Sequence, residues 1–184
     1  MRYLTCLVIG AAVATAACSV DDLRPTAGIL NVVDTVTLGA LDGSALTVPS
    51  AFSVANNTTV RTDQSSNFDF AYNIVSSQHE LIPVQLLNLL TKSTTNPGFI
   101  RSTVPFDSIF TAPLNGYILD SAQVVAPGDV FLARSVILCS STGTASYAKL
   151  EIMSIDDSAK TVTFRVLADV NCGYHDLQPG IPNN

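Results

Sequence analysis

Residues 129–170 read "DVFLARSVILCSSTGTASYAKLEIMSIDDSAKTVTFRVLADV" and contain three β-rich runs, at 129–139, 146–155 and 161–170. The short segments between the runs are rich in Ser, Thr, Gly and Asp, residues that favour turns. One face of the third run carries only apolar side chains, those of Val162, Phe164, Val166, Ala168 and Val170. The pattern predicts a C-terminal three-stranded antiparallel meander with one apolar face.

In such a meander the end of the first strand and the end of the third lie at the same end of the sheet. Cys139 ends the first run and Cys172 follows the third, so the sequence predicts a disulfide between them. A zinc site is the alternative, but it needs further ligands. The chain has only two histidines and no C-x-x-C motif, which favours the disulfide.

Upstream of the meander, the β signal continues in shorter runs. In residues 66–75, "SNFDFAYNIV", alternation places Phe68, Phe70, Tyr72 and Ile74 on one face. In residues 30–38, "LNVVDTVTL", the shared face is formed by Leu30, Val32, Val36 and Leu38. Further short strands are expected in 45–54, 99–104 and 116–125.

One segment, residues 79–92 ("HELIPVQLLNLLTK"), has the apolar spacing of a helix, and Pro83 suits a first helical turn. We therefore expect a short helix over 83–91. The predicted fold class is mainly β: an antiparallel β-sandwich or distorted barrel with one short helix, forming a single domain over 28–184.

The N-terminus has the features of an export signal. Arg2 is followed by an apolar stretch too short to span a bilayer, and small residues then lead to Cys18. This resembles the bacterial lipobox, which predicts a signal peptide at 1–17, acylation of Cys18 and a lipid-anchored tether at 18–27. Ordinary cleavage after the A-x-A sequence of residues 14–16 is the alternative.

Charge and motifs exclude several functions. The net charge is −6, and no basic stripe is present, so a nucleic-acid partner is not expected. The sequence lacks a G-x-S-x-G motif, a P-loop and a dinucleotide-binding glycine motif, so an enzyme is not expected either. The two histidines, His79 and His175, are both expected in loops. Their side chains are either exposed to water or turned inward as ligands.

Three segments, 68–74, 125–135 and 146–166, resemble the HmuY family of bacterial surface lipoproteins. Residues 68–72 occupy the place of an aromatic-Asp strand motif, with Phe where the family has Trp. The later hairpin and strand motifs are filled by Gly128, Val130, Arg134, Tyr147, Lys149, Leu150, Ile152, Val162 and Phe164.

The resemblance implies an all-β lipoprotein of a family whose best-known members bind haem and pass it to an outer-membrane transporter. Haem in that family is held by two histidines, or by methionines in some relatives, in loops outside the quoted motifs. His79 and His175 are therefore the candidate haem ligands here, although no motif maps them onto the family's ligands.

Together these features predict a non-enzymatic ligand-binding lipoprotein, anchored through Cys18 in the cell envelope, at the outer membrane. It would face the periplasm or the cell surface. Haem is the ligand that the resemblance implies. The alternative is a structural or protein-interaction module of the envelope with no small-molecule ligand.

Overall fold

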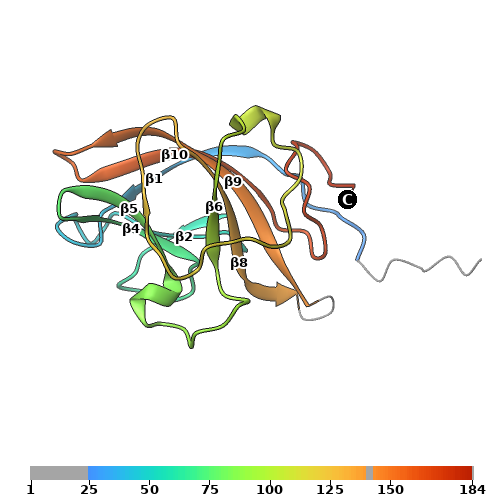
Figure 1. Cartoon of the computed structure of the whole chain (residues 1–184), viewed down its shortest axis with the longest axis horizontal. Helices are drawn as coiled ribbons and strands as arrows, with labels where there is room; N and C mark the ends of the chain where they lie inside the picture. Colours follow the sequence, from blue (N-terminus) through green and yellow to red (C-terminus); the bar gives the residue numbers. More distant parts are fainter. Residues whose placement is uncertain (1–24, 140–142, 184) are drawn as a thin grey trace, which may run out of the picture.

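The computed structural model describes residues 25–139 and 143–183, which form two five-stranded antiparallel sheets packed as an open sandwich (Figure 1). The first sheet has the order β1 (Val33–Gly39), β10 (Thr161–Asp169), β9 (Thr144–Asp156), β8 (Val130–Cys139) and β6 (Gly98–Ser102). The second has the order β3 (Thr58–Val60), β2 (Ala51–Ser53), β4 (Phe70–Val75), β5 (Gln78–Pro83) and β7 (Gln123–Val124). The sheets do not close into a barrel.

The predicted meander is confirmed: β9 pairs with β8 on one side and with β10 on the other, antiparallel throughout. The alternating residues of β10 face the second sheet, where Phe164 contacts Phe52 and Phe70 edge-on or tilted. Phe70 and Tyr72 of β4 also enter this main core, as their spacing predicts, whereas Phe68 packs in a separate small cluster with Ala71 and Val84.

A second apolar core covers the outer face of the first sheet. The chain between β6 and β7, residues 103–122, crosses that face and is called here the β6–β7 connection (Figure 1). It places Phe106, Ile109 and Ala112 over Leu132 and Leu167, which point outward from β8 and β10. The first sheet is therefore buried on both faces over this region.

The predicted helix at 83–91 is wrong. Strand β5 runs through Pro83, and only a 3₁₀ turn, η1 (Val84–Leu87), follows before Asn88 adopts a left-handed conformation with φ of 56°. A helix of this length needs a buried apolar face, but Leu86, Leu89 and Leu90 remain exposed. The described residues contain no α-helix, and none of their helices is long and apolar enough to cross a membrane.

Cys139 and Cys172 form a disulfide with their Cα atoms 5.5 Å apart, joining the end of β8 to the chain after β10. The two ends of the described chain meet beside it. The Asn171 Oδ1 atom accepts hydrogen bonds from the N–H groups of Gly28 and Ile29, and Asn31 pairs with Gly180. Residues 28–31 are held by these bonds and precede β1. Leu30 and Val32 are therefore exposed and, contrary to the predicted alternation, do not share the buried face of Leu38.

Candidate functional site

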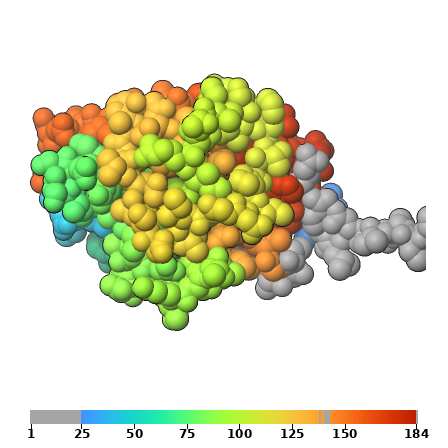
Figure 2. All heavy atoms as spheres, viewed as in Figure 1, coloured from blue at the N-terminus to red at the C-terminus, as the bar shows by residue number. Residues whose placement is uncertain are grey.

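A groove with a volume of about 550 Å³ lies between two segments that are distant in sequence. One wall comes from the loop after β5 and consists of Gln85 and residues 92–94. The other wall is residues 117–120 of the β6–β7 connection. Figure 2 shows the face of the molecule on which the yellow β6–β7 connection and the lime-green loop after β5 lie next to each other.

The side-chain amide of Gln85 is held in one orientation. Its Oε1 atom accepts a hydrogen bond from the Ser93 N–H at 3.3 Å and another from Asn96 Nδ2 at 2.7 Å. Asn96 Nδ2 also donates to the Thr91 carbonyl at 2.9 Å, which fixes the orientation of Asn96 in turn. Because both donors require an oxygen, the NH₂ group of Gln85 must point elsewhere.

This NH₂ group donates no hydrogen bond within the described part of the chain, although the Gln85 side chain is only 7% exposed and lines the groove. Nε2 is not among the fully enclosed unpartnered side-chain atoms of the described residues, so the small exposed part of Gln85 includes this NH₂ group. The loop therefore presents a fixed, unused donor to whatever occupies the groove.

The second wall is attached to the edge of the first sheet. Ile118 exchanges two hydrogen bonds with Phe99 of β6, at 2.8 and 3.0 Å, and so extends the sheet by one residue pair. Gly98 permits this close approach, because a Cβ atom there would lie 2.5 Å from the Ile118 carbonyl oxygen and 2.4 Å from a methyl of Leu119.

Arg134 of β8 joins the two walls from beneath. Its guanidinium group donates to the carbonyls of Thr94 and Asn96, both at 2.8 Å, and lies 5.2 Å from the centre of the Tyr117 ring. Tyr147 packs against Tyr117 on the same side. Burial raises the pKa of Tyr117, so its hydroxyl stays protonated; it has no hydrogen-bond partner among the described residues.

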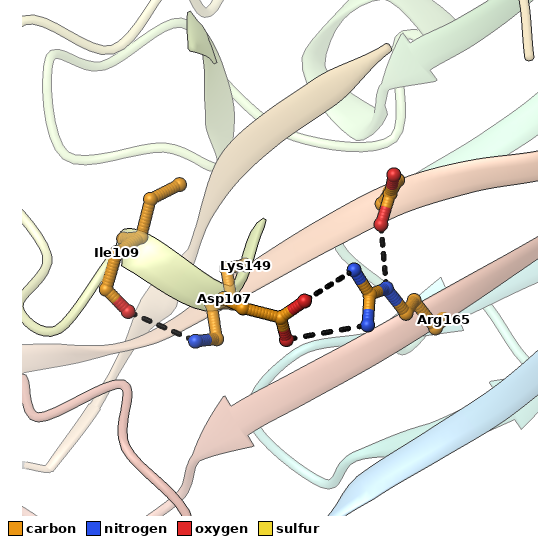
Figure 3. Close-up of polar contacts among 5 residues, drawn as sticks. Asp107, Ile109, Lys149 and Arg165 are labelled. Atoms are coloured by element: carbon orange, nitrogen blue, oxygen red, sulfur yellow. Dashed lines mark hydrogen bonds and ion pairs between the residues drawn. The ribbon is translucent and has the colours of Figure 1, made fainter. Parts of the chain in front are cut away.

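Polar contacts hold the rest of the β6–β7 connection on the sheet (Figure 3). Lys149 Nζ donates to the Ile109 carbonyl at 2.9 Å, and Arg165 forms ion pairs with Asp107 and Glu151. Both cations also lie over the Phe106 ring, at 4.6 and 4.2 Å from its centre. Burial lowers the pKa of Lys149. The groove wall is thus part of a segment that is held at several points.

No family model, curated protein or solved structure matches this chain.

His79 does not lie in a loop, as its sequence context predicted, but within β5. Its Nδ1 atom is 2.6 Å from the Tyr72 hydroxyl and its Nε2 atom is 2.9 Å from Asp157. The three side chains have the order of a catalytic relay, yet Tyr72 is fully buried and burial raises its pKa to about 12. Tyr72 is therefore a core residue and not an accessible nucleophile.

His175 lies at the other end of the molecule. His79 contacts Asp157, in the turn before β10, whereas Asp176, the residue after His175, donates its N–H to Asp169 at the end of β10. The two ends of β10 are about 26 Å apart at about 3.3 Å per residue. The structure therefore does not bring His79 and His175 together, and both ring nitrogens of His79 are already engaged.

The described residues contain no group of three or more His, Cys, Asp or Glu side chains arranged to hold a metal ion. Cys18, the predicted signal segment 1–17 and residues 18–24 of the predicted tether lie outside them. Sequence reasoning missed the groove residues Gln85, Tyr117 and Leu119. The helix expected over 83–91 covers Gln85, and the polar run that follows it carries no pattern that marks a groove.

Proposed function

We propose that this protein is a non-enzymatic binding module of the bacterial cell envelope, anchored through an acylated Cys18, which holds its partner in the groove between residues 85–94 and 117–120. The observation that carries the proposal is the Gln85 amide. It is buried and oriented by two internal donors, and its own donors remain unused at the groove surface.

The motif residues that resemble the HmuY family support the same site. Arg134 bridges the two walls, Tyr147 packs beneath Tyr117, and Lys149 holds the β6–β7 connection. Membership of that family remains part of the proposal. Haem held between His79 and His175 is not part of the proposal, because the two rings lie toward opposite ends of β10.

The anchor is tested by replacing Cys18 with serine in the full chain. Acylation predicts that the wild-type protein fractionates with membranes and incorporates a fatty-acid analogue, and that Cys18→Ser does neither. Unchanged membrane fractionation of the variant, with labelling retained, would rule out this anchor.

The groove is tested by photo-crosslinking in cells that express the chain naturally. A photoreactive amino acid at Ile118, which is 44% exposed on the groove wall, should give a covalent adduct whose yield falls when Gln85 is changed to Glu. The matched control is Val75, which is equally exposed, at 43%, and does not line the groove. Equal adducts at both positions, or none at Ile118, would contradict a binding role for the groove.

A further inference from the structure

We infer that the occupant of the groove is an extended peptide segment of a partner protein, which adds as a strand to residues 117–119 at the edge of the first sheet. This inference rests on the proposed binding function of the groove and names the chemical class of the partner.

Among the described residues, the backbone of this wall has unpaired groups on its outer side. In an extended chain, the N–H and C=O groups of successive residues point to opposite sides. Both groups of Ile118 point toward Phe99, so those of Tyr117 and Leu119 point away from β6, toward the open side. Neither residue forms a backbone hydrogen bond within the described part of the chain. Such an unpaired edge is a template for strand addition.

Gln85 lies on the opposite wall of the groove. A peptide paired to Tyr117 and Leu119 on one side has its remaining backbone carbonyls directed to the other side. A fixed amide donor at that side is the group that a backbone carbonyl accepts from. The Gln85 NH₂ therefore complements the half of the peptide backbone that strand pairing leaves free.

The exposed side chains of the groove indicate which residues the partner carries. Ile118 is exposed on the groove wall, and its neighbours Tyr117 and Leu119 are half-buried there. Apolar side chains of an added strand would bury this surface. Lys92 and Asp120 carry opposite charges on opposite walls, and neither forms an ion pair within residues 25–139 and 143–183. The groove thus suits a segment with apolar residues and both an acidic and a basic residue.

A neutral glycan is the competing class, because an amide donor is also suited to hydroxyl-rich ligands. The backbone of Tyr117 and Leu119 favours the peptide. Alternating N–H and C=O groups at strand spacing match another extended backbone, whereas a glycan needs no such alternation.

The test uses the full chain purified from membranes in detergent micelles. Twelve-residue random peptides displayed on phage are selected against it, and selected peptides are synthesised with a fluorophore for anisotropy titration. Chitohexaose and maltohexaose serve as glycan probes. The variant Gln85→Glu keeps the acceptor for Ser93 and Asn96 but removes the free donor. Gln64→Glu, at an exposed position outside the groove, makes the same charge change as a control.

Selected peptides should bind the wild-type and Gln64→Glu proteins equally and the Gln85→Glu protein about tenfold more weakly, the effect of losing one hydrogen bond. Methylating peptide backbone nitrogens one at a time should weaken binding at every second residue. This scan uses only the wild-type protein, so it does not depend on the folding of a variant. Binding that is insensitive to both changes would overturn the inference.

Failure of the inference and failure of the proposed function give different results. If a glycan probe binds and Gln85→Glu weakens that binding, the groove is a binding site but the peptide assignment is wrong. If peptides and glycans alike show no binding that depends on Gln85, and Ile118 gives no adduct in cells, the proposed function fails as well.

Discussion

The carboxylate of Asp69 joins the two sheets of the sandwich, accepting a hydrogen bond from the Val136 N–H of β8 at 2.9 Å. Its second oxygen accepts from Val54 and Ala55, which follow β2 in the other sheet, at 2.7 and 3.4 Å. The side chain is almost fully buried, and desolvation raises the pKa of Asp69 to about 6 although the three N–H donors oppose this shift.

Asp69 should make the stability of the fold depend on pH. Since its pKa is about 6 in the native state and 3.8 in the unfolded chain, the native state binds more protons between these values. The contribution of Asp69 to the free energy of unfolding is therefore full below about pH 4 and is lost as the pH rises through 6. Urea denaturation should show a wild-type advantage over Asp69→Asn that is about 2 kcal/mol larger at pH 4.5 than at pH 7.5.

The variant Asp69→Asn removes the titration while other acidic groups remain, so only the difference between the two proteins is informative. A difference that is constant with pH, or larger at pH 7.5, would contradict the assignment of a raised pKa to Asp69.

Gln85 offers a matched pair of substitutions. Gln85→Leu removes the acceptor of the Ser93 N–H and of Asn96 Nδ2, so it should lower the free energy of unfolding by about 1–3 kcal/mol. Gln85→Glu keeps an acceptor for both donors and should cost less than Gln85→Leu. Chemical denaturation measures both, and equal losses would show that the two internal hydrogen bonds do not orient this side chain.

The disulfide closes a loop between residues 33 positions apart in the chain. Replacing both Cys139 and Cys172 with serine should lower the free energy of unfolding by about 3–4 kcal/mol, because the unfolded chain regains freedom. Calorimetry before and after reduction provides the control, since a reductant should destabilise only the wild-type protein. Free thiols at both positions in oxidised protein, found by mass spectrometry, would be inconsistent with this cross-link.

Phe106 is the centre of the contacts that hold the β6–β7 connection. It is fully buried under Lys149 and Arg165, so Phe106→Ala should cost about 3–5 kcal/mol. Phe110 lies in the same connection but is 55% exposed, and Phe110→Ala should change stability by less than about 0.5 kcal/mol. Similar losses for the two variants in denaturation experiments would mean that the connection is not held through Phe106.

Hemin added to the purified protein should give no low-spin spectrum that depends on both histidines. His79 contacts Tyr72 and Asp157 at one end of β10, and His175 lies toward the other end. Optical titration of the wild type with His79→Ala and His175→Ala checks this. A low-spin spectrum lost in each variant would restore the bis-histidine site.

The β10 strand and its neighbours could be predicted because each buries one face, and burial of one face produces alternation in the sequence. Phe164 and Val166 are examples. The expected helix over 83–91 did not form, although apolar residues at 82, 86 and 89–90 have helical spacing. Such spacing predicts a helix only when the apolar face is buried. Ile82 is buried by the sheet, and Leu86 and Leu89 are exposed.

The groove could not be predicted, since it depends on contacts between segments without periodicity. Gln85 acquires its role from Asn96, and the free backbone of Tyr117 and Leu119 results from a single residue pair between Ile118 and Phe99. A sequence pattern contains no signal for one isolated pair. A sequence pattern also does not show that Asn96 will orient the Gln85 side chain.

Asn171 has a mechanical consequence. It binds the backbone of Gly28 and Ile29, and the next residue, Cys172, is cross-linked to β8. A force applied to the chain before residue 27 therefore enters the fold through the contacts of residues 27–31 with residues 171–180, Asn171 among them, and spreads into the covalently joined ends of β8 and β10. Tension on the N-terminal chain is thereby shared with the first sheet, and β1, an edge strand, is shielded from being peeled away.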